Sequence, residues 1–371
     1  MKIRITTYHK VINRGAILQA YGTFLNLKSL FPEADVRFID NLPLSLETYE
    51  LLRAIPRKKS NIHKWKRFIL IREDVKKLFS LDKTSLKTLS QKLTEKDILV
   101  SGSDCIWRID SDFPIPAFPN DYWLPYKTKA RKISFSTSAS GSKAPLIAQH
   151  QEAIDTFAKD YDLIAVRDQH TKDMIHREDI VITPDPSFLV PLKLETTYHP
   201  DVESFFTTFP KAVGLQIYHN DFPDHVTDYI DSNINNGCLG LTNNFKTNLS
   251  ADHLINTLQW TNIFGRLSFC ITDSFHGTIF NLRNKTPFIS LETKGYARNK
   301  SKKFYLLSYC GLEDLYLNLE EHQNNPHIIS ERQHIIQDNW ESIYLPKIEA
   351  GLAKIQEDLN NYNQKILNLI S

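Results

Sequence analysis

The stretch that decides the fold is LSFCITDSFHGT, at residues 267–278. Its apolar first half ends on Asp273 and Ser274, which is typical of a parallel strand covered on both faces. The residues that follow predict a helix that begins beside His276 and Gly277. The free backbone N–H groups of that helix would point into the crevice at the carboxyl end of the strand. The stretch therefore predicts a strand, a turn and an anion-binding helix start.

His276 places an imidazole beside this helix start, where a group that titrates near neutral pH can move a proton. A substrate that carries phosphate and requires a proton transfer would fit such a site. A hydrogen-bonded turn residue would look the same in the sequence, so this stretch alone leaves both interpretations open.

Strands that end in polar residues recur along the chain. One ends in Ser103 and Asp104, and another ends on Arg167 before a helix-like segment. Short apolar strands that alternate with polar turns and helices indicate an α/β protein with parallel sheets. Ligands bind such proteins where the carboxyl ends of the strands converge. The expected strands lie at residues 2–8, 35–40, 97–101, 132–136, 162–167, 179–182, 212–218, 237–241, 267–272 and 286–291.

The length of 371 residues predicts two domains, because a single core rarely grows so large. We expect an N-terminal α/β domain at residues 1–192 and a C-terminal α/β domain at residues 210–345, joined by a polar connection. Apolar residues at helical spacing predict one helix over about 250–264 and a long final helix over about 330–368.

Composition argues against several classes of protein. The net charge of +2 is small, and no RNP motif, zinc finger or basic repeat occurs, so we expect no nucleic-acid partner. No apolar run approaches the ~20 residues that cross a bilayer, and the N-terminus lacks the apolar core of a signal peptide. The four cysteines show no CxxC spacing, which predicts reduced thiols in a cytoplasmic protein. The 13 histidines include no HExxH or HxH pair, so we expect neither a metal site nor a cofactor.

A basic helical insertion is expected at about residues 44–95. Residues 53–77 contain ten Lys and Arg against Glu73 and Asp74, interleaved with apolar residues. Such a segment is typical of peripheral contact with an anionic membrane surface, here at the inner face, or with an anionic lipid-linked acceptor. A solvated face whose apolar side packs on the domain would give the same pattern, and the sequence does not decide between them.

Taken together, the motifs resemble those of the polysaccharide pyruvyl transferase family. The resemblance covers roughly residues 1–315, and the ordered set of motifs is more specific than any single one. The motifs are NRGAILQAY at residues 13–21, GSDCIW at 102–107, AVRD at 165–168 and SFHG at 274–277.

This resemblance implies a glycosyltransferase B-like fold, with two doubly wound Rossmann-like domains and an active site in the cleft between them. It implies that the final helix, at residues 346–371, crosses back and packs on the N-terminal domain. It also implies transfer of a pyruvyl group from phosphoenolpyruvate to sugar hydroxyls. The product would be a ketal on a cell-surface polysaccharide or its lipid-linked precursor.

The chain departs from the family pattern at three positions. Cys105 and Arg108 stand where relatives often carry Gln and Asn, and Ser274 stands where some relatives carry an arginine two residues before the histidine. The missing arginine removes a bidentate ligand for phosphate or carboxylate. Cations that follow the strand ending at Leu291 would replace it: Arg298, Lys300, Lys302 and Lys303.

The implied chemistry needs an acid, a base and cations, and this sets the candidate roles. His276 is the candidate acid or base, Arg167 would bind the anionic donor, and the Gly277 helix start would bind phosphate. Asp104 and Asp273 would bind sugar hydroxyls or orient His276. Structural interpretations stand beside these: a turn or helix cap for each aspartate, and a surface salt bridge for Arg167. The full candidate site is His276 and Asp104 as catalytic residues, with Arg167, Ser274, Gly277, Asp273, Ser103, Asn13, Gly15, Arg298 and Lys300 as substrate-binding residues.

Two other classes of protein remain open. A glycosyltransferase that uses a nucleotide sugar would share the fold and the anion-binding helix start. A non-catalytic saccharide-binding protein would keep both cores but would need neither Arg167 nor His276.

Overall fold

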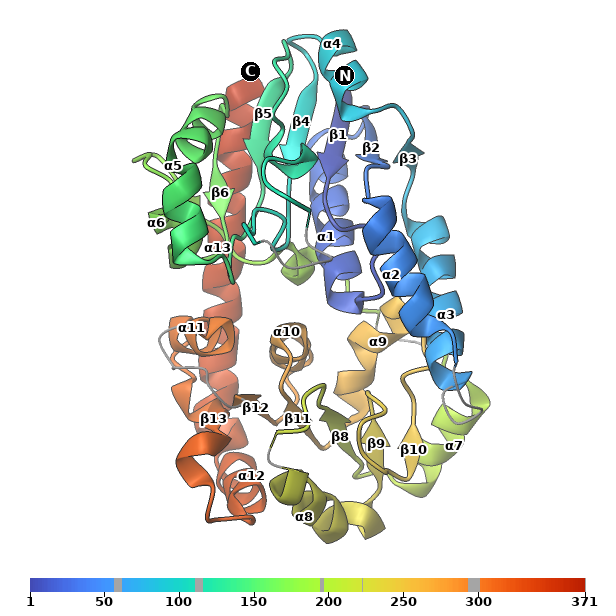
Figure 1. The fold of residues 1–371 in the computed structure, drawn as a ribbon. Helices are drawn as coiled ribbons and strands as arrows, with labels where there is room; N and C mark the ends of the chain where they lie inside the picture. Colours follow the sequence, from blue (N-terminus) through green and yellow to red (C-terminus); the bar gives the residue numbers. More distant parts are fainter. Residues whose placement is uncertain (57–61, 111–115, 194–196, 222, 293–300, 371) are drawn as a thin grey trace. The chain divides into compact units, whose positions relative to one another are not determined.

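A computed structural model describes residues 1–56, 62–110, 116–193, 197–221, 223–292 and 301–370. The chain divides into two compact units. The N-terminal unit comprises Met1–Val190 and Gln356–Ser371, and the C-terminal unit comprises Pro191–Ile355. Each unit is built on a parallel sheet with helices packed against it (Figure 1).

The sheet of the N-terminal unit has the strand order β3-β2-β1-β4-β5. All pairs are parallel, and Ile5 on β1 lies opposite Phe38 on β2 and Val100 on β4. Bridges from Ile133 to Leu163 and from Thr137 to Val166 continue the sheet toward β6. The strands are β1 (Lys2–Thr6), β2 (Asp35–Ile39), β3 (Leu81–Asp82), β4 (Ile98–Ser101), β5 (Arg131–Ser134), β6 (Ala165–Val166) and β7 (Val181–Ile182).

Helices in this unit begin at recognisable caps. Asn13 accepts hydrogen bonds from the backbone N–H groups of Gly15 and Ala16 and so starts α1, and Asp168 caps α6 through Thr171. Stacked indoles of Trp107 and Trp123, 4.7 Å apart, lie in the core under the carboxyl end of β4. The helices are α1 (Arg14–Leu30), α2 (Leu44–Ala54), α3 (Ile62–Leu78), α4 (Leu86–Lys92), α5 (Ala144–Lys159) and α6 (Gln169–Asp173), with 3₁₀ turns at Asp121–Trp123 and Pro186–Leu189.

The sheet of the C-terminal unit has the order β10-β9-β8-β11-β12-β13, again with every pair parallel. Both sheets thus grow outward in both directions from their first strand, which is the doubly wound topology. The strands are β8 (Val213–Gln216), β9 (Cys238–Gly240), β10 (Leu249–Ser250), β11 (Phe269–Thr272), β12 (Phe288–Glu292) and β13 (Tyr316–Asn318).

Helices of the C-terminal unit cover this sheet, and an aromatic cluster lies in its otherwise mostly aliphatic core. Trp260 packs edge to face on Phe264 and Phe280, with ring centroids 5.0 and 5.4 Å away. The helix expected at residues 250–264 starts later, at Thr257, because residues 249–250 pair with β9 and Asn256 forms a capping box with Gln259. The helices are α7 (Pro200–Thr208), α8 (Pro223–Asn233), α9 (Thr257–Ile263), α10 (Phe275–Asn284), α11 (Lys302–Tyr309) and α12 (Ile328–Asp338).

The long final helix expected from the sequence is interrupted. A π-helical turn at Trp340–Tyr344 separates α12 from α13 (Leu345–Ile370). Buried residues here recur every four positions, at Ile336, Trp340, Tyr344 and Ile348. That spacing is wider than the 3.6 residues of an α-helical turn, and a wider π turn keeps all four on the buried side.

The end of α13 packs within the N-terminal unit. The ring of Tyr362 stacks on Phe135 at 5.3 Å, and its hydroxyl donates to the carbonyl of Ser134. Asn363 and Asn26 exchange side-chain hydrogen bonds of 2.9 and 2.7 Å. No helix in the described part of the chain has the length and hydropathy of a bilayer-spanning segment.

Candidate functional site

In the N-terminal unit, polar residues follow β1 and β4 at the carboxyl edge of the sheet. The hydroxyl of Thr7, just after β1, donates a 2.6 Å hydrogen bond to the carbonyl of Ser103. Asp104 has a φ of 85°, a left-handed conformation that costs about 1–2 kcal/mol for a residue with a Cβ. Such conformations cluster at functional sites, where the surrounding structure holds them in place. Asp104 is therefore the best supported candidate in this unit.

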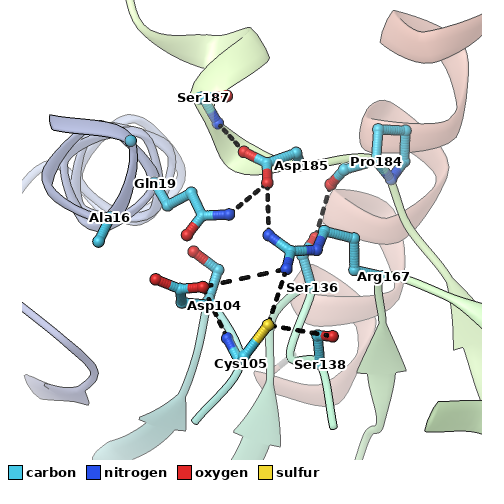
Figure 2. Close-up of polar contacts among 12 residues, drawn as sticks. Ala16, Gln19, Asp104, Cys105, Ser136, Ser138, Arg167, Pro184, Asp185 and Ser187 are labelled. Atoms are coloured by element: carbon cyan, nitrogen blue, oxygen red, sulfur yellow. Dashed lines mark hydrogen bonds and ion pairs between the residues drawn. The ribbon is translucent and has the colours of Figure 1, made fainter. Parts of the chain in front are cut away.

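Arg167 anchors a buried polar cluster at the same edge, shown in Figure 2. Its Nη1 donates to Asp185 Oδ2 at 2.8 Å, and both side chains are at least 95% buried. Its Nη2 donates to Cys105 Sγ at 3.4 Å and lies 3.9 Å from Asp104 Oδ1. The structure thus brings Asp104 and Arg167 together, as the strand ends predicted. The interpretation of Arg167 as a surface salt bridge is wrong, because the side chain is buried.

Asp185 is held from two further directions. Gln19, on α1, donates from its side-chain amide to Asp185 Oδ2, and the backbone N–H of Ser187 donates to Oδ1 at 2.9 Å (Figure 2). These contacts tie the start of the Pro186–Leu189 turn and the middle of α1 to Arg167. Arg167 is therefore fixed in one position.

Carboxylates outnumber the one buried cation of this cluster. Burial lowers the pKa of the Arg167 guanidinium. The neighbouring Cys105, Asp185 and Asp104 raise the pKa by more than burial lowers it, so the net shift is upward. Burial raises the pKa of Asp168, yet hydrogen bonds from Ser138 and Thr171 bring it below its ordinary value. The carboxylates of such a cluster can accept hydrogen bonds from hydroxyl groups, whereas a second anion would be repelled by them. These contacts give Arg167 a positioning role within the cluster, and its contact with an anionic donor stays a prediction.

The other candidates of this unit take structural positions. Asn13 is exposed and caps α1, and Gly15 is buried in the first turn of that helix. Ser103 is fully buried, and its hydroxyl has no hydrogen-bond partner among the described residues. Ser103 directly precedes Asp104 in the chain. Helix α1 contacts the Arg167 cluster through Gln19 and not through Asn13 or Gly15.

In the C-terminal unit, β11 leads directly into α10. Ser274 is the N-cap of α10, and its hydroxyl accepts a hydrogen bond from the backbone N–H of Gly277 at 3.4 Å. His276 is half-buried in the first turn, with its ring 5.5 Å from that of Phe275. The strand, turn and helix start predicted from the sequence are all present.

Gly277 has a packing role that the sequence did not show. A Cβ added there would lie 1.8 Å from Gln216 Oε1 and 2.2 Å from Thr272 Oγ1. Those two atoms share a 2.8 Å hydrogen bond in the core. Only glycine lets the first turn of α10 approach β8 and β11 this closely.

Asp273 holds His219, a histidine that was not selected from the sequence. Its Oδ2 accepts hydrogen bonds from the backbone N–H groups of Tyr218 and His219, at 2.9 and 2.8 Å, and contacts His219 Nδ1 at 2.9 Å. The cap of α10 is Ser274 and not Asp273. Asp273 and His219 form a carboxylate–imidazole pair at the carboxyl ends of β8 and β11.

The cations expected to replace the missing arginine are placed only in part. Lys303 is buried and donates to Glu292 Oε1 at 2.9 Å and to the carbonyl of Asp273 at 2.9 Å, so its charge is already paired. Lys302 is half-buried at the start of α11. Arg298 and Lys300 lie outside the described residues.

Three residues of these clusters were not selected from the sequence: Gln19, Asp185 and His219. Asp185 follows β7 and His219 follows the strand at 212–218, so the rule that polar residues at strand ends form sites would have included both. Gln19 lies inside a helix, where nothing in the sequence sets it apart. Among the described residues, no group of three or more His, Cys, Asp or Glu side chains is arranged to hold a metal ion.

Solved structures share this fold at low sequence identity. A protein of Listeria monocytogenes assigned as a UDP-N-acetylglucosamine 2-epimerase superposes with a TM-score of 0.50 at 10% identity, over 98% of this chain and 97% of that one. A spinosyn rhamnosyltransferase gives 0.48 at 7% identity, over 100% and 99%. The UDP-N-acetylglucosamine 2-epimerase of Neisseria meningitidis gives 0.48 at 11%, over 97% and 100%. The fold is that of two Rossmann-like domains of the glycosyltransferase B type, as predicted.

The family is shown by the sequence itself. The model of the polysaccharide pyruvyl transferase family matches residues 13–295, and the chain belongs to that family. The resemblance drawn from the four motifs is thereby confirmed. No curated protein matches the sequence at a significant level.

Proposed function

We propose that this protein transfers the pyruvyl group of phosphoenolpyruvate to two hydroxyls of a saccharide and forms a cyclic ketal. The observation that carries the proposal is His276 in the first turn of α10, beside the capping Ser274 at the end of β11. A proton-transfer group at a helix N-terminus matches a donor that bears phosphate and must be protonated on carbon.

The reaction balances without water or a cofactor. A proton added to the methylene carbon of phosphoenolpyruvate makes C2 electrophilic, and one sugar hydroxyl adds there and loses its proton. The C2–O bond to phosphate then breaks, and the second hydroxyl adds to C2 and loses its proton. The products are one ketal and one inorganic phosphate. The two hydroxyls lose two protons in total, which balances the one proton gained by the methylene carbon and the one gained by phosphate.

We assign the donor to the start of α10. The N-terminal turn of this ten-residue helix favours phosphate through its backbone N–H groups and dipole. His276 supplies the proton to the methylene carbon, and the Asp273–His219 pair is a second proton-transfer group of the same unit. Lys303 holds the backbone of Asp273 by donating a hydrogen bond to its carbonyl oxygen.

We assign the saccharide hydroxyls to Asp104, with the fully buried Ser103 beside it as structural support. Asp104 would accept a hydrogen bond from a saccharide hydroxyl, and Arg167 lies 3.9 Å from that carboxylate. The acceptor class that fits is a saccharide or its lipid-linked precursor. The four cysteines are free thiols, which agrees with a reaction in the cytoplasm.

The direct test is to incubate the full chain with phosphoenolpyruvate and candidate saccharides, both free and lipid-linked. The proposal expects a saccharide mass gain equal to a pyruvyl ketal, with one phosphate released per ketal. His276→Ala should lower the rate by about 10²–10⁴-fold with an unchanged melting temperature, because this is the usual contribution of a general acid or base. His334→Ala, at an exposed histidine, is the control that should keep full activity.

A glycosyltransferase that uses a nucleotide sugar is the competing function. It predicts a saccharide mass gain equal to a sugar residue, with a nucleoside diphosphate released and no use of phosphoenolpyruvate. Heat protection by a nucleoside diphosphate and none by phosphoenolpyruvate would favour it, because a ligand that binds the folded state raises the melting temperature. Near wild-type turnover by His276→Ala would remove the proposed acid whichever donor is used.

A further inference from the structure

The helices α2 and α3 form a basic, partly apolar surface on the N-terminal unit. They lie side by side (Figure 1), and we call them the α2–α3 hairpin. In the sequence, residues 44–78 contain ten Lys and Arg and four Asp and Glu, a net charge of +6; three of the basic residues, Arg57, Lys58 and Lys59, lie outside the described residues. Since the whole chain carries +2, the rest of the chain carries −4. Positive charge is therefore concentrated in this one segment.

Large apolar side chains are exposed on the same hairpin. In α2 and at its end, three of them recur at spacings of seven and four residues, which places them on one side of the helix. Most of the exposed large apolar residues of the described chain belong to this segment. They are Leu44 (77% exposed), Leu51 (39%), Leu52 (60%), Ile55 (46%), Ile62 (47%) and Ile69 (39%).

On α3, exposed lysines share a face with the exposed isoleucines. Ile62, Lys66, Ile69, Glu73 and Lys77 are all exposed and recur at spacings of three or four residues, and the exposed Lys76 lies seven residues after Ile69, so the stripe holds three lysines and one carboxylate. Apolar side chains flanked by lysines in one stripe are typical of a helix that lies in a membrane interface.

The hairpin does not need these side chains for its own packing. Its inner side buries Leu46, Phe68, Ile71 and Val75. The interpretation of the segment as a solvated face whose apolar side packs on the domain accounts for these buried residues. It leaves the exposed leucines and isoleucines without a role.

We propose that the exposed face of the α2–α3 hairpin docks the protein on an anionic phospholipid surface. The leucines and isoleucines would enter the interface, and the lysines would meet lipid head groups, with each basic residue near the surface contributing roughly fivefold in binding. A second copy of this chain is a poorer occupant, because it would bring two surfaces of the same net positive charge together. The proposal is independent of the reaction, although docking would place the chain where lipid-linked saccharides lie.

The test is vesicle co-sedimentation of the full-length protein. We expect binding to vesicles that contain phosphatidylglycerol, little binding to pure phosphatidylcholine, and release at high salt, because screening acts over ~10 Å at 0.1 M. Lys66→Glu/Lys76→Glu/Lys77→Glu should weaken binding by at least ~100-fold, by the same contribution for each lysine. Leu44→Ser/Leu52→Ser should weaken binding without changing the salt dependence.

A matched variant separates this surface from general charge. Lys87→Glu/Lys96→Glu/Lys159→Glu changes the net charge equally, at exposed lysines elsewhere on the same unit, and should keep vesicle binding. The proposal is overturned if the wild type ignores anionic vesicles at low salt, or if both triple variants lose binding equally. It is also overturned if the protein forms dimers in sedimentation velocity that Leu44→Ser/Leu52→Ser dissociates while vesicle binding is absent.

Discussion

Replacing Gly277 by alanine tests how α10 is fixed against the sheet. The added Cβ would lie 1.8 Å from Gln216 Oε1 and 2.2 Å from Thr272 Oγ1, well inside van der Waals contact. Both neighbours are buried and hydrogen-bonded to each other at 2.8 Å, so neither can move aside freely. Overpacking of this kind costs typically 1–3 kcal/mol, and two close contacts place Gly277→Ala at about 3.

Alanine also favours a helix over glycine by about 1 kcal/mol, so the net loss in the free energy of unfolding should be about 2 kcal/mol. The measurement is urea unfolding followed by circular dichroism, in the wild-type background and in Gln216→Ala. Because that background removes the nearest atom, Gly277→Ala should cost there roughly half as much.

Two results would refute this reasoning. Equal costs in the two backgrounds would mean that Gln216 does not limit the approach of α10. A Gly277→Ala protein of full stability but weaker affinity for phosphoenolpyruvate would show instead that Gly277 acts by contact with phosphate.

Other predictions concern the Arg167 cluster and the thiols. Asp185→Asn should cost about 3 kcal/mol in urea unfolding, the lower end for breaking a buried pair, whereas Asp179→Asn, at an exposed pair, should cost less than about 1. Iodoacetamide at neutral pH should modify Cys105 first, as read by peptide mass, because burial raises the pKa of two other thiols to about 12 and of the third to about 11. Asp168 has a folded pKa below its unfolded value near ~3.9, so it stabilises the fold above that pH and loses this contribution as the pH falls through the folded pKa. Asp168→Asn should therefore lower stability at pH 7 and flatten the acid side of the stability profile.

Sequence patterns predicted the sheets well because buried parallel strands leave few alternatives. The run before Ser101 is apolar throughout, and Ile98, Leu99 and Val100 are fully buried in β4. The two-residue strands β3 and β10, unlike β6 and β7, do not lie within longer apolar runs, and their pairing depends on a neighbouring strand. They were missed for that reason.

The sequence identified the site residues that follow strands, but it did not predict which residues contact one another. Asp104 and Arg167 were selected because each follows a strand, and the fold brings them within 3.9 Å. Arg167 is paired with Asp185, and Gln19 holds the same carboxylate because α1 packs beside the Pro186–Leu189 turn, a contact between segments far apart in the chain. Spacing along a sequence carries no information on such a contact, so the positive charge of Arg167 looked available for a donor.

The most direct test of the central claim is to run the reaction in heavy water with phosphoenolpyruvate and an accepted saccharide. Protonation of the methylene carbon predicts a ketal whose methyl group contains one deuterium, read by proton NMR and mass, together with one phosphate per ketal. A product that keeps the CH₂ group as an enol ether would contradict ketal formation. A saccharide that gains mass only from a nucleotide sugar would contradict pyruvyl transfer itself.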